Sequence, residues 1–254
     1  MTQIEKAHRF AGLHRPGTPL ILFNVWDAGS ARAVAEAGAA AIATGSWSAA
    51  EANGFEDGER LPLDLAIANA ARIAAAVELP VTIDFEGGYA VDPGAVGANF
   101  AMLLATGAVG CNVEDRAIGS DGLHPLPVQA RRIEAMRRAA ERSGIPAFIN
   151  ARTDIFLQVK PEHHDRAAAD AALERARAYA DAGASGFFVP GLADEALLAR
   201  ICAAAPLPVN AMMFAGMPGA RRLAELGVAR ISHGPGPYRQ AMKALTEAAR
   251  TAMG

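Results

Sequence analysis

The chain has 254 residues, of which 52% are hydrophobic and 20% are charged, and its 24 basic and 27 acidic residues leave a formal net charge of −3. This composition excludes a chain that is disordered throughout, and the near balance of charge excludes a strongly basic nucleic-acid-binding protein. No apolar run reaches the roughly 18 residues of a membrane span, and residues 1–17 lack the apolar core of a secretion signal. The two cysteines, Cys111 and Cys202, have neither metal-ligand nor redox spacing. We therefore expect a cytoplasmic protein without nucleic-acid or membrane partners.

Along the chain, short apolar segments alternate with longer Ala-, Leu- and Arg-rich segments of helical periodicity, after a possible extra helix over residues 2–12. The expected strands are 20–25, 40–44, 80–85, 109–114, 146–151, 185–190, 207–212 and 228–233, and clear helical patterns cover 127–143, 163–182, 193–204 and 237–253. Alternating strands and helices predict a parallel sheet, and eight such units predict a single α/β domain over 1–254, a (β/α)8 TIM-type barrel. An open doubly wound sheet is the alternative, weakened because no G-x-G-x-x-G follows the first strand.

Polar residues follow many of these strands, at the end of the barrel where active sites lie. Because residues two apart on a strand share a face, Asp84 and Glu86 are expected to point together, as are Asn112 with Glu114 and Asn150 with Arg152. Three converging carboxylates repel one another unless a cation compensates, and an all-oxygen set suits Mg²⁺ or Mn²⁺. The sequence therefore predicts a metal site at Asp84, Glu86 and Glu114, the alternative being helix caps and surface acids.

Other residues near these strand ends suit an acidic substrate. Arg152 is a fork-shaped donor for a carboxylate or phosphonate, unless it only braces the acids. The turn 44–48 could offer backbone N–H groups to an oxyanion, with Trp47 as a wall. The loop 116–127 is expected to be a mobile cover. Further expectations are substrate-binding roles for Asn112 and Asn210, proton transfer as a lesser possibility for His124 and His233, a surface or capping position for Asp115, and a core thiol at Cys111.

Lysine-imine chemistry is disfavoured, because such a mechanism needs a lysine buried in the site. The only lysines are Lys6, Lys160 and Lys243, and none falls at the end of an expected strand. Bond cleavage would then depend on a metal ion and on hydrogen-bond donors to stabilise an enolate.

Five segments together resemble the isocitrate lyase/phosphoenolpyruvate mutase superfamily. They are NVWDAGSARAVAEAGAAAIATGS (24–46), GFEDGERLPLD (54–64), LPVTIDFEGGY (79–89), GAVGCNVEDR (107–116) and INARTDIFL (149–157). The resemblance implies a (β/α)8 barrel, often with one helix exchanged between the subunits of a homodimer or homotetramer, and binding of Mg²⁺ and of small α-oxo or α-hydroxy acids.

The same resemblance implies roles for individual residues. Asp84 matches the direct metal ligand, Glu86 replaces an aspartate of the mutase, Glu114 matches a further acid around the metal, and Asp57 matches an acid that reaches the metal through water. Arg152 matches the arginine that holds the substrate carboxylate. Gly45, Ser46 and Trp47 match the oxyanion-binding turn, although a serine common in the superfamily aligns with Gly45.

Two departures limit what the resemblance predicts. The loop 116–127 contains neither the Lys-Lys-Cys-Gly-His motif of the lyases nor the lysine and asparagine of the phosphonate enzymes, and residues 189–191 replace a mutase histidine. The leading hypothesis is a Mg²⁺-dependent lyase that cleaves or forms a C–C bond in a small α-oxo or 2-hydroxy di- or tricarboxylate through a metal-stabilised enolate. The alternatives are a P–C bond enzyme of the phosphonopyruvate mutase or hydrolase type, and a non-catalytic oxyacid-binding barrel.

Overall fold

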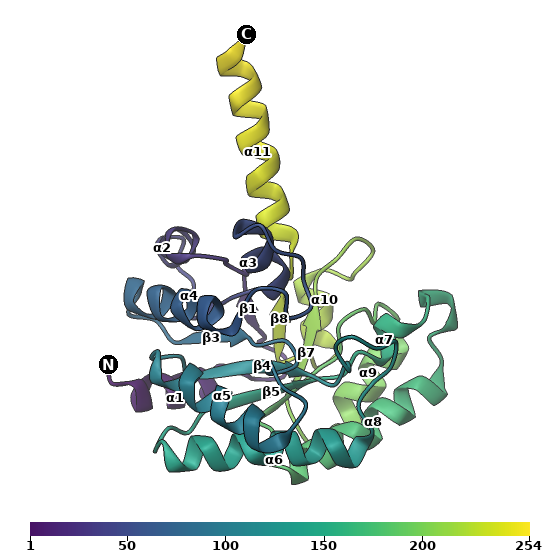
Figure 1. The fold of residues 1–254 in the computed structure, drawn as a ribbon. Helices are drawn as coiled ribbons and strands as arrows, with labels where there is room; N and C mark the ends of the chain where they lie inside the picture. Colours follow the sequence, from purple (N-terminus) through teal and green to yellow (C-terminus); the bar gives the residue numbers. More distant parts are fainter.

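The computed structural model describes residues 1–254 and contains a barrel of eight parallel strands (Figure 1). The strands are β1 (Leu20–Leu22), β2 (Ile42–Ala43), β3 (Val81–Asp84), β4 (Gly110–Glu114), β5 (Phe148–Arg152), β6 (Gly186–Phe188), β7 (Val209–Met212) and β8 (Arg230–Ser232). From β2 to β8 each strand pairs with the next in chain order, and β8 also pairs with β1. An isolated parallel bridge between Val25 and Thr44 joins the chain just after β1 and β2. The predicted (β/α)8 barrel is therefore confirmed.

Helices follow most strands and surround the barrel. They are α1 (Gln3–Gly12), α2 (Ala28–Glu36), α3 (Ser46–Ala52), α4 (Leu63–Ala76), α5 (Pro93–Ala105), α6 (Leu126–Arg142), α7 (Ile155–Gln158), the 3-10 helix η1 (Pro161–His163), α8 (Arg166–Asp181), α9 (Glu195–Ala204), α10 (Ala220–Glu225) and α11 (Gly236–Met253). Local chemistry sets their ends. Asp92 and Asp165 each accept a hydrogen bond from the third helical N–H of the helix that follows, which satisfies a free donor there. Gly183, at φ +92°, ends the segment after α8 in a left-handed conformation that favours glycine.

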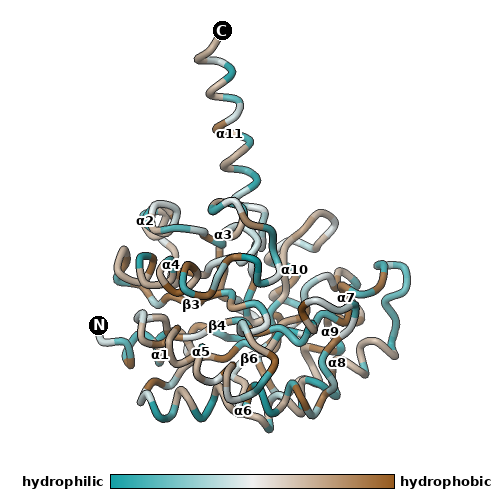
Figure 2. The backbone as a smooth tube through the Cα atoms, viewed as in Figure 1, coloured by the Kyte–Doolittle hydropathy of each residue, from teal (hydrophilic) through white to brown (hydrophobic).

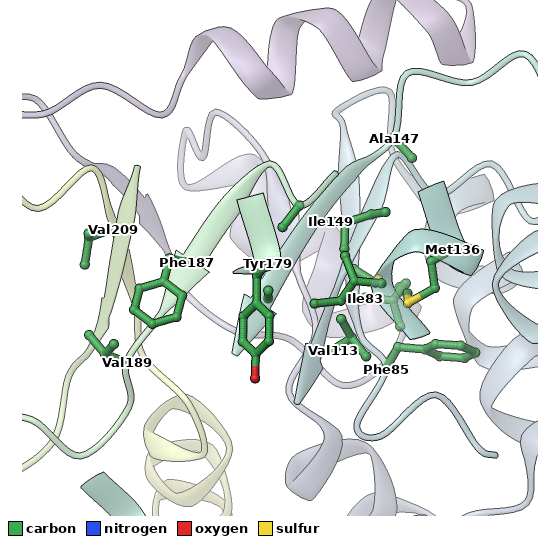
Figure 3. Close-up of a cluster of buried hydrophobic side chains, with 14 of the residues drawn as sticks. Ile83, Phe85, Val113, Met136, Ala147, Ile149, Tyr179, Phe187, Val189 and Val209 are labelled. Carbon is green, nitrogen blue, oxygen red and sulfur yellow. The ribbon is translucent and has the colours of Figure 1, made fainter. Parts of the chain in front are cut away.

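Most of the buried apolar side chains fall into two clusters. The larger has 40 buried residues and lies between the strands and the surrounding helices, as the side chains of Ile83, Val113, Ile149 and Phe187 in Figure 3 illustrate. The smaller has eight, and in it Phe10 of α1 packs at the amino-terminal end of the barrel. The expected extra helix is thus a plug for one end of the barrel, and the carboxyl ends of the strands remain open for a site.

The last helix, α11, projects from the barrel instead of packing on it (Figure 1), and its only buried residue is Pro237. Beside β1 and α2 lies an apolar groove of about 770 Å³ whose lining includes Ile21, Phe23 and Val34. Figure 2 shows polar and apolar positions alternating along α11. None of the helices is both long enough and apolar enough to cross a membrane.

Candidate active site

A cavity of about 180 Å³ opens at the carboxyl ends of the strands. It is smaller than the roughly 300–1,000 Å³ of pockets for drug-sized ligands, so it suits a small molecule. Its lining combines residues from every part of the barrel: Asn24, Gly45, Ser46, Trp47, Ser48, Asp57, Asp84, Asn112, Arg152, Phe188, Met212, Ser232, Gly234 and Pro235.

Asp84 ends β3 and faces this cavity. Its Oδ2 accepts hydrogen bonds from the backbone N–H of Ser46 at 3.1 Å and from the Ser46 hydroxyl at 3.0 Å, and its Oδ1 accepts one from Asn112 Nδ2 at 3.2 Å. The main chain is fixed as well, since the Asp84 N–H donates to Thr44 Oγ1 at 2.9 Å. Donors from the turn after β2 and from β4 therefore hold this carboxylate in one orientation.

Arg152 ends β5 and is held on two sides by carboxylates. Its Nη1 lies 2.8 Å from Glu114 Oε2, while its Nε and Nη2 donate to the two Asp154 oxygens at 2.5 and 2.9 Å. Burial raises the pKa of Glu114, the Arg152 charge opposes this rise, and the charges of Asp154 and Asp84 add to it. The expectation that Arg152 braces the acids and the expectation that it binds substrate are compatible, because it also lines the cavity.

Asp115 corrects one expectation, since it is neither a surface acid nor a helix cap. It is fully buried, and its Oδ1 accepts the backbone N–H of Asp154 at 2.9 Å. Its Oδ2 accepts hydrogen bonds from Tyr179 at 2.8 Å and from Arg175 at 3.1 Å. The chain Asp115–Asp154–Arg152 thus positions the cavity arginine, and sequence spacing gave no sign that α8 supplies its outer partners.

Glu86 lies beyond the end of β3, so the strand alternation applied to it does not hold. Its φ is +47°, in the left-handed region that is uncommon for a residue with a side chain. Its Oε2 accepts the backbone N–H groups of Gly58 and Glu59 at 2.8 and 2.6 Å, and Oε1 accepts the Tyr89 hydroxyl at 3.1 Å. Burial raises the pKa of Glu86 to about 7, despite the Glu59 N–H that favours the charged form. Glu86 therefore ties the 57–59 loop to the barrel and does not line the cavity.

The carboxylates near Asp84 nevertheless form a concentration of negative charge. Burial, followed by the charge of Asp84, raises the pKa of Asp57, and Asp84 also raises the pKa of Glu86 and Glu114. No three His, Cys, Asp or Glu side chains lie close enough together to enclose a metal ion. Asp84 with water could still hold Mg²⁺, which keeps several waters and often binds one or two carboxylates. Direct ligation by Glu86 and Glu114 stays a prediction.

The turn predicted to bind an oxyanion lies at the cavity, but two of its N–H groups are engaged. Gly45 N–H donates to Val25 O at 3.1 Å, and Ser46 N–H donates to Asp84. Gly45 also sits close to other groups, since a Cβ there would meet the Gly234 carbonyl at 3.6 Å. Trp47 lines the cavity and contacts Tyr238 edge-to-face, with Arg239 over its ring at 4.7 Å.

Of the remaining predicted residues, one lines the cavity and the others lie outside its lining. Asn112 lines the cavity, whereas Asn210 is buried beneath it and accepts from Asn150 and Ser232. His124 and His233 do not line it, and Cys111 is a fully buried core thiol as expected. The 116–127 loop is pinned by a bridge between Arg116 and Leu123 and faces the 56–60 loop across about 520 Å³.

Comparison with known proteins decides the family. The family model described as phosphoenolpyruvate phosphomutase matches residues 10–253. The chain belongs to the phosphoenolpyruvate phosphomutase family. Relatives named 2-methylisocitrate lyase and oxaloacetate decarboxylase also support the wider isocitrate lyase/phosphoenolpyruvate mutase superfamily.

Three relatives show how this family member compares. A crystal structure of a Burkholderia cenocepacia J2315 protein, provisionally named a phosphonomutase, is 53% identical, with a TM-score of 0.96 over 98% of this chain and 99% of that one. An uncharacterised Mycobacterium tuberculosis protein is 36% identical over 95% of this chain and 87% of its own length. The oxaloacetate decarboxylase of Ectopseudomonas mendocina is 30% identical over 91% of this chain and 79% of its own length.

Sequence reasoning missed the apolar part of this family member's cavity. Phe188, Met212 and Pro235 line it beside Arg152 and Asp84. Their only signal in the sequence was position, since Phe188 lies within the sixth expected strand, 185–190, and Met212 ends the seventh, 207–212. Apolar residues at strand ends look the same as core residues until the barrel is built.

Proposed function

We propose that the protein is a Mg²⁺-dependent carbon–carbon lyase that acts on a small α-oxo or 2-hydroxy carboxylate through an enolate. The observation that carries this proposal is one small cavity lined by both Asp84 and Arg152, whose guanidinium keeps two N–H groups beyond those given to Glu114 and Asp154. The superfamily contains lyases and mutases, and the relatives' names include both, so the lyase reaction and the substrate are our inference.

Two charged residues would bind the metal ion and the substrate, and neighbouring residues keep their side chains oriented. Asp84 would hold the metal, and Ser46 and Asn112 keep its carboxylate oriented. When bound, Mg²⁺ supplies positive charge that stabilises negative charge developing on an oxygen of the substrate. Arg152 would bind the substrate carboxylate, and its contact with Asp154 fixes the plane of the guanidinium.

Oxalate provides the test, because it has the shape and charge of a small enolate. We expect calorimetry to detect saturable oxalate binding in the presence of Mg²⁺ and at least tenfold weaker binding without it. Asp84→Asn should lose this metal dependence, because the substitution removes the charged ligand. Asp181→Asn, which changes an exposed acid at the end of α8, is the matched control and should bind like the native protein.

Turnover is measured next, by the release of an α-oxo acid from a panel of α-oxo and 2-hydroxy acids. Metal-independent binding, or unchanged turnover in Asp84→Asn, would contradict the proposal. Saturable oxalate binding with no product from any acid would favour a non-catalytic oxyacid-binding barrel.

A phosphonate enzyme is the second candidate, favoured by the likeness to the provisionally named phosphonomutase of B. cenocepacia. Against it, the cavity contains no lysine or histidine to meet a phosphonate dianion. Phosphorus NMR of phosphonopyruvate incubated with the protein and Mg²⁺ separates the two. A changed phosphorus signal would support the phosphonate enzyme, and an unchanged one would exclude it.

A further inference from the structure

Arg230 of β8 is a buried cation inside the barrel that costs the fold more than it returns. Its side chain is fully buried and forms no ion pair, and while Nη2 has a hydrogen-bond partner, Nε and Nη1 have none. The ring of Phe10 lies 6.0 Å from its guanidinium carbon, at the roughly 6 Å limit of cation–π attraction. Burial lowers the pKa of Arg230 to about 9. A buried charge with incomplete hydrogen bonding is unfavourable, so the stability of the fold does not explain this arginine.

The one hydrogen bond of the Arg230 side chain leads to the candidate active site. Nη2 donates to Asn112 Oδ1 at 3.0 Å, and Asn112 Nδ2 donates to Asp84 Oδ1 at 3.2 Å. These residues belong to β8, β4 and β3, so the connection crosses the interior of the barrel. Arg230 therefore reaches, through one amide group, the carboxylate that is proposed to hold the metal.

The contacts of Asn112 allow its amide only one orientation. An arginine side chain has N–H donors and no acceptor, so the Asn112 atom that faces Arg230 must be the oxygen. Asn150 Nδ2 donates to the same oxygen at 2.9 Å, but an amide can donate or accept and would adapt to either orientation. Arg230 thus turns the NH2 group of Asn112 toward Asp84. In the opposite orientation, the amide oxygen would face the carboxylate and repel it.

We propose that Arg230 is a positioning residue for the metal site, because it fixes the amide of Asn112 and thereby the carboxylate of Asp84. This inference rests on the proposed function, which assigns the metal to Asp84. It also gives Asn112 a role beside the substrate contact expected from the sequence. Groups that orient the ligands of a metal commonly contribute about 10–100-fold to its affinity. Arg230 would then raise the affinity for the metal at the expense of stability.

The experiment measures Mn²⁺ binding, since Mn²⁺ accepts the same oxygen ligands as Mg²⁺ and the electron paramagnetic resonance signal of the free ion disappears on binding. We expect Arg230→Met to bind Mn²⁺ at least about tenfold more weakly than the native protein. Its melting temperature should be unchanged or higher, because an apolar residue of similar size replaces an incompletely paired buried charge. Arg137→Met is the matched control. Arg137 is half-buried on α6 and donates to Gly183 O and to the Ser185 hydroxyl, so its loss should lower the melting temperature and leave the Mn²⁺ affinity unchanged.

A double-mutant cycle tests whether Arg230 acts through Asn112. Asn112→Leu removes the amide, and adding Arg230→Met should then weaken Mn²⁺ binding by less than about threefold, because coupled residues are not additive. A full tenfold further loss would mean that Arg230 acts on Asp84 without the amide, and would overturn the inference. Arg230→Gln is the second variant, in case Arg230→Met does not fold. Its amide can donate or accept and no longer forces the orientation, so Mn²⁺ binding should weaken by at least about threefold.

The outcomes separate this inference from the proposed function. Asp84→Asn should abolish Mn²⁺ binding. A native protein that binds no Mn²⁺, or equal binding by Asp84→Asn, would contradict the proposed function and this inference with it. Native binding that requires Asp84 but is unchanged in folded Arg230→Met or Arg230→Gln would overturn the role of Arg230 alone.

Discussion

Arg152 shows at the scale of one residue why charge alone does not define this site. Lysine would keep the positive charge but could not contact Glu114, Asp154 and a substrate carboxylate together, because it has a single ammonium group. We expect Arg152→Lys to lower kcat/KM for an accepted α-oxo acid by roughly 100-fold, comparable to the loss of one stabilising donor. Arg138→Lys, at an exposed ion pair with Glu134, is the control. A loss of less than about threefold in Arg152→Lys would contradict the assigned role.

The residues of the site also differ in how well their side-chain positions could be predicted from the sequence. Asp84, Asn112 and Arg152 could be predicted because they lie on strands, where alternation fixes the side-chain direction. Glu86 follows the end of β3, and its position depends on N–H groups of Gly58 and Glu59, some 27 residues away in the chain. Asp115 likewise depends on Arg175 and Tyr179. Such partners come together only in the folded barrel, and local patterns do not contain them.

His14 makes stability depend on pH at the closed end of the barrel. Its ring stacks on Phe148 at 3.9 Å, and burial, followed by the Arg230 charge, lowers its pKa to about 3. The folded protein therefore keeps His14 neutral, while the unfolded chain binds a proton below about pH 6.5. Stability should fall as the pH decreases from 6.5 toward 3, by up to about 1.4 kcal/mol per pH unit from this residue.

The measurement is the free energy of unfolding in urea at pH 7 and pH 5. We expect His14→Phe to lose about 2 kcal/mol less between these pH values than the native protein does. His8→Gln, at an exposed position on α1, serves as the control and should keep the native pH dependence. The same pH dependence in His14→Phe as in the native protein would show that His14 is not the cause.

At the scale of elements, α1 acts as the plug of the barrel. Phe10 is fully buried and meets Phe148 edge-to-face at 5.5 Å, and Gln3 donates to the carbonyls of Leu104 and Ala108. We expect Phe10→Ala to lower the free energy of unfolding by about 3–5 kcal/mol, because it leaves a cavity between α1 and the strands. Ile4→Ala, exposed on the same helix, should cost far less. Similar losses in both variants would argue against the plug.

The sequence predicts which strands exist better than it predicts where each strand begins and ends. All eight expected strands are present, but most are shorter, as with β1, which is Leu20–Leu22 where 20–25 was expected. Residues leave the ladder at both ends: β7 begins at Val209 where 207 was expected, and β1 ends before Phe23, Asn24 and Val25. Hydrophobic periodicity cannot detect this change, since a strand end and a loop that carries active-site residues have the same local composition.

At the scale of the whole molecule, α11 and the groove beside β1 are two surfaces that the chain itself leaves uncovered. The last helix of a closed (β/α)8 barrel would cover β8 and β1, but α11 projects away, and Ile21 and Phe23 stay about 42% and 41% exposed. Along α11, Met242 and Leu245 fall at helical spacing with Ala248, Ala249 and Met253, which forms one apolar stripe. We propose that α11 of a second copy packs on this groove and that the two copies exchange the helix.

This arrangement predicts a concentration-dependent homo-oligomer. Truncation after Ala241 should yield a monomer by light scattering and should lower the thermal stability, because the groove of about 770 Å³ would lose its cover. Leu245→Lys should weaken association by placing a charge on the apolar stripe, whereas Lys243→Glu changes the charge on a neighbouring exposed position and should leave association intact. A native protein that remains monomeric at micromolar concentration would contradict the exchange. So would a truncated protein that keeps the native oligomeric state, because the groove would then have some other occupant.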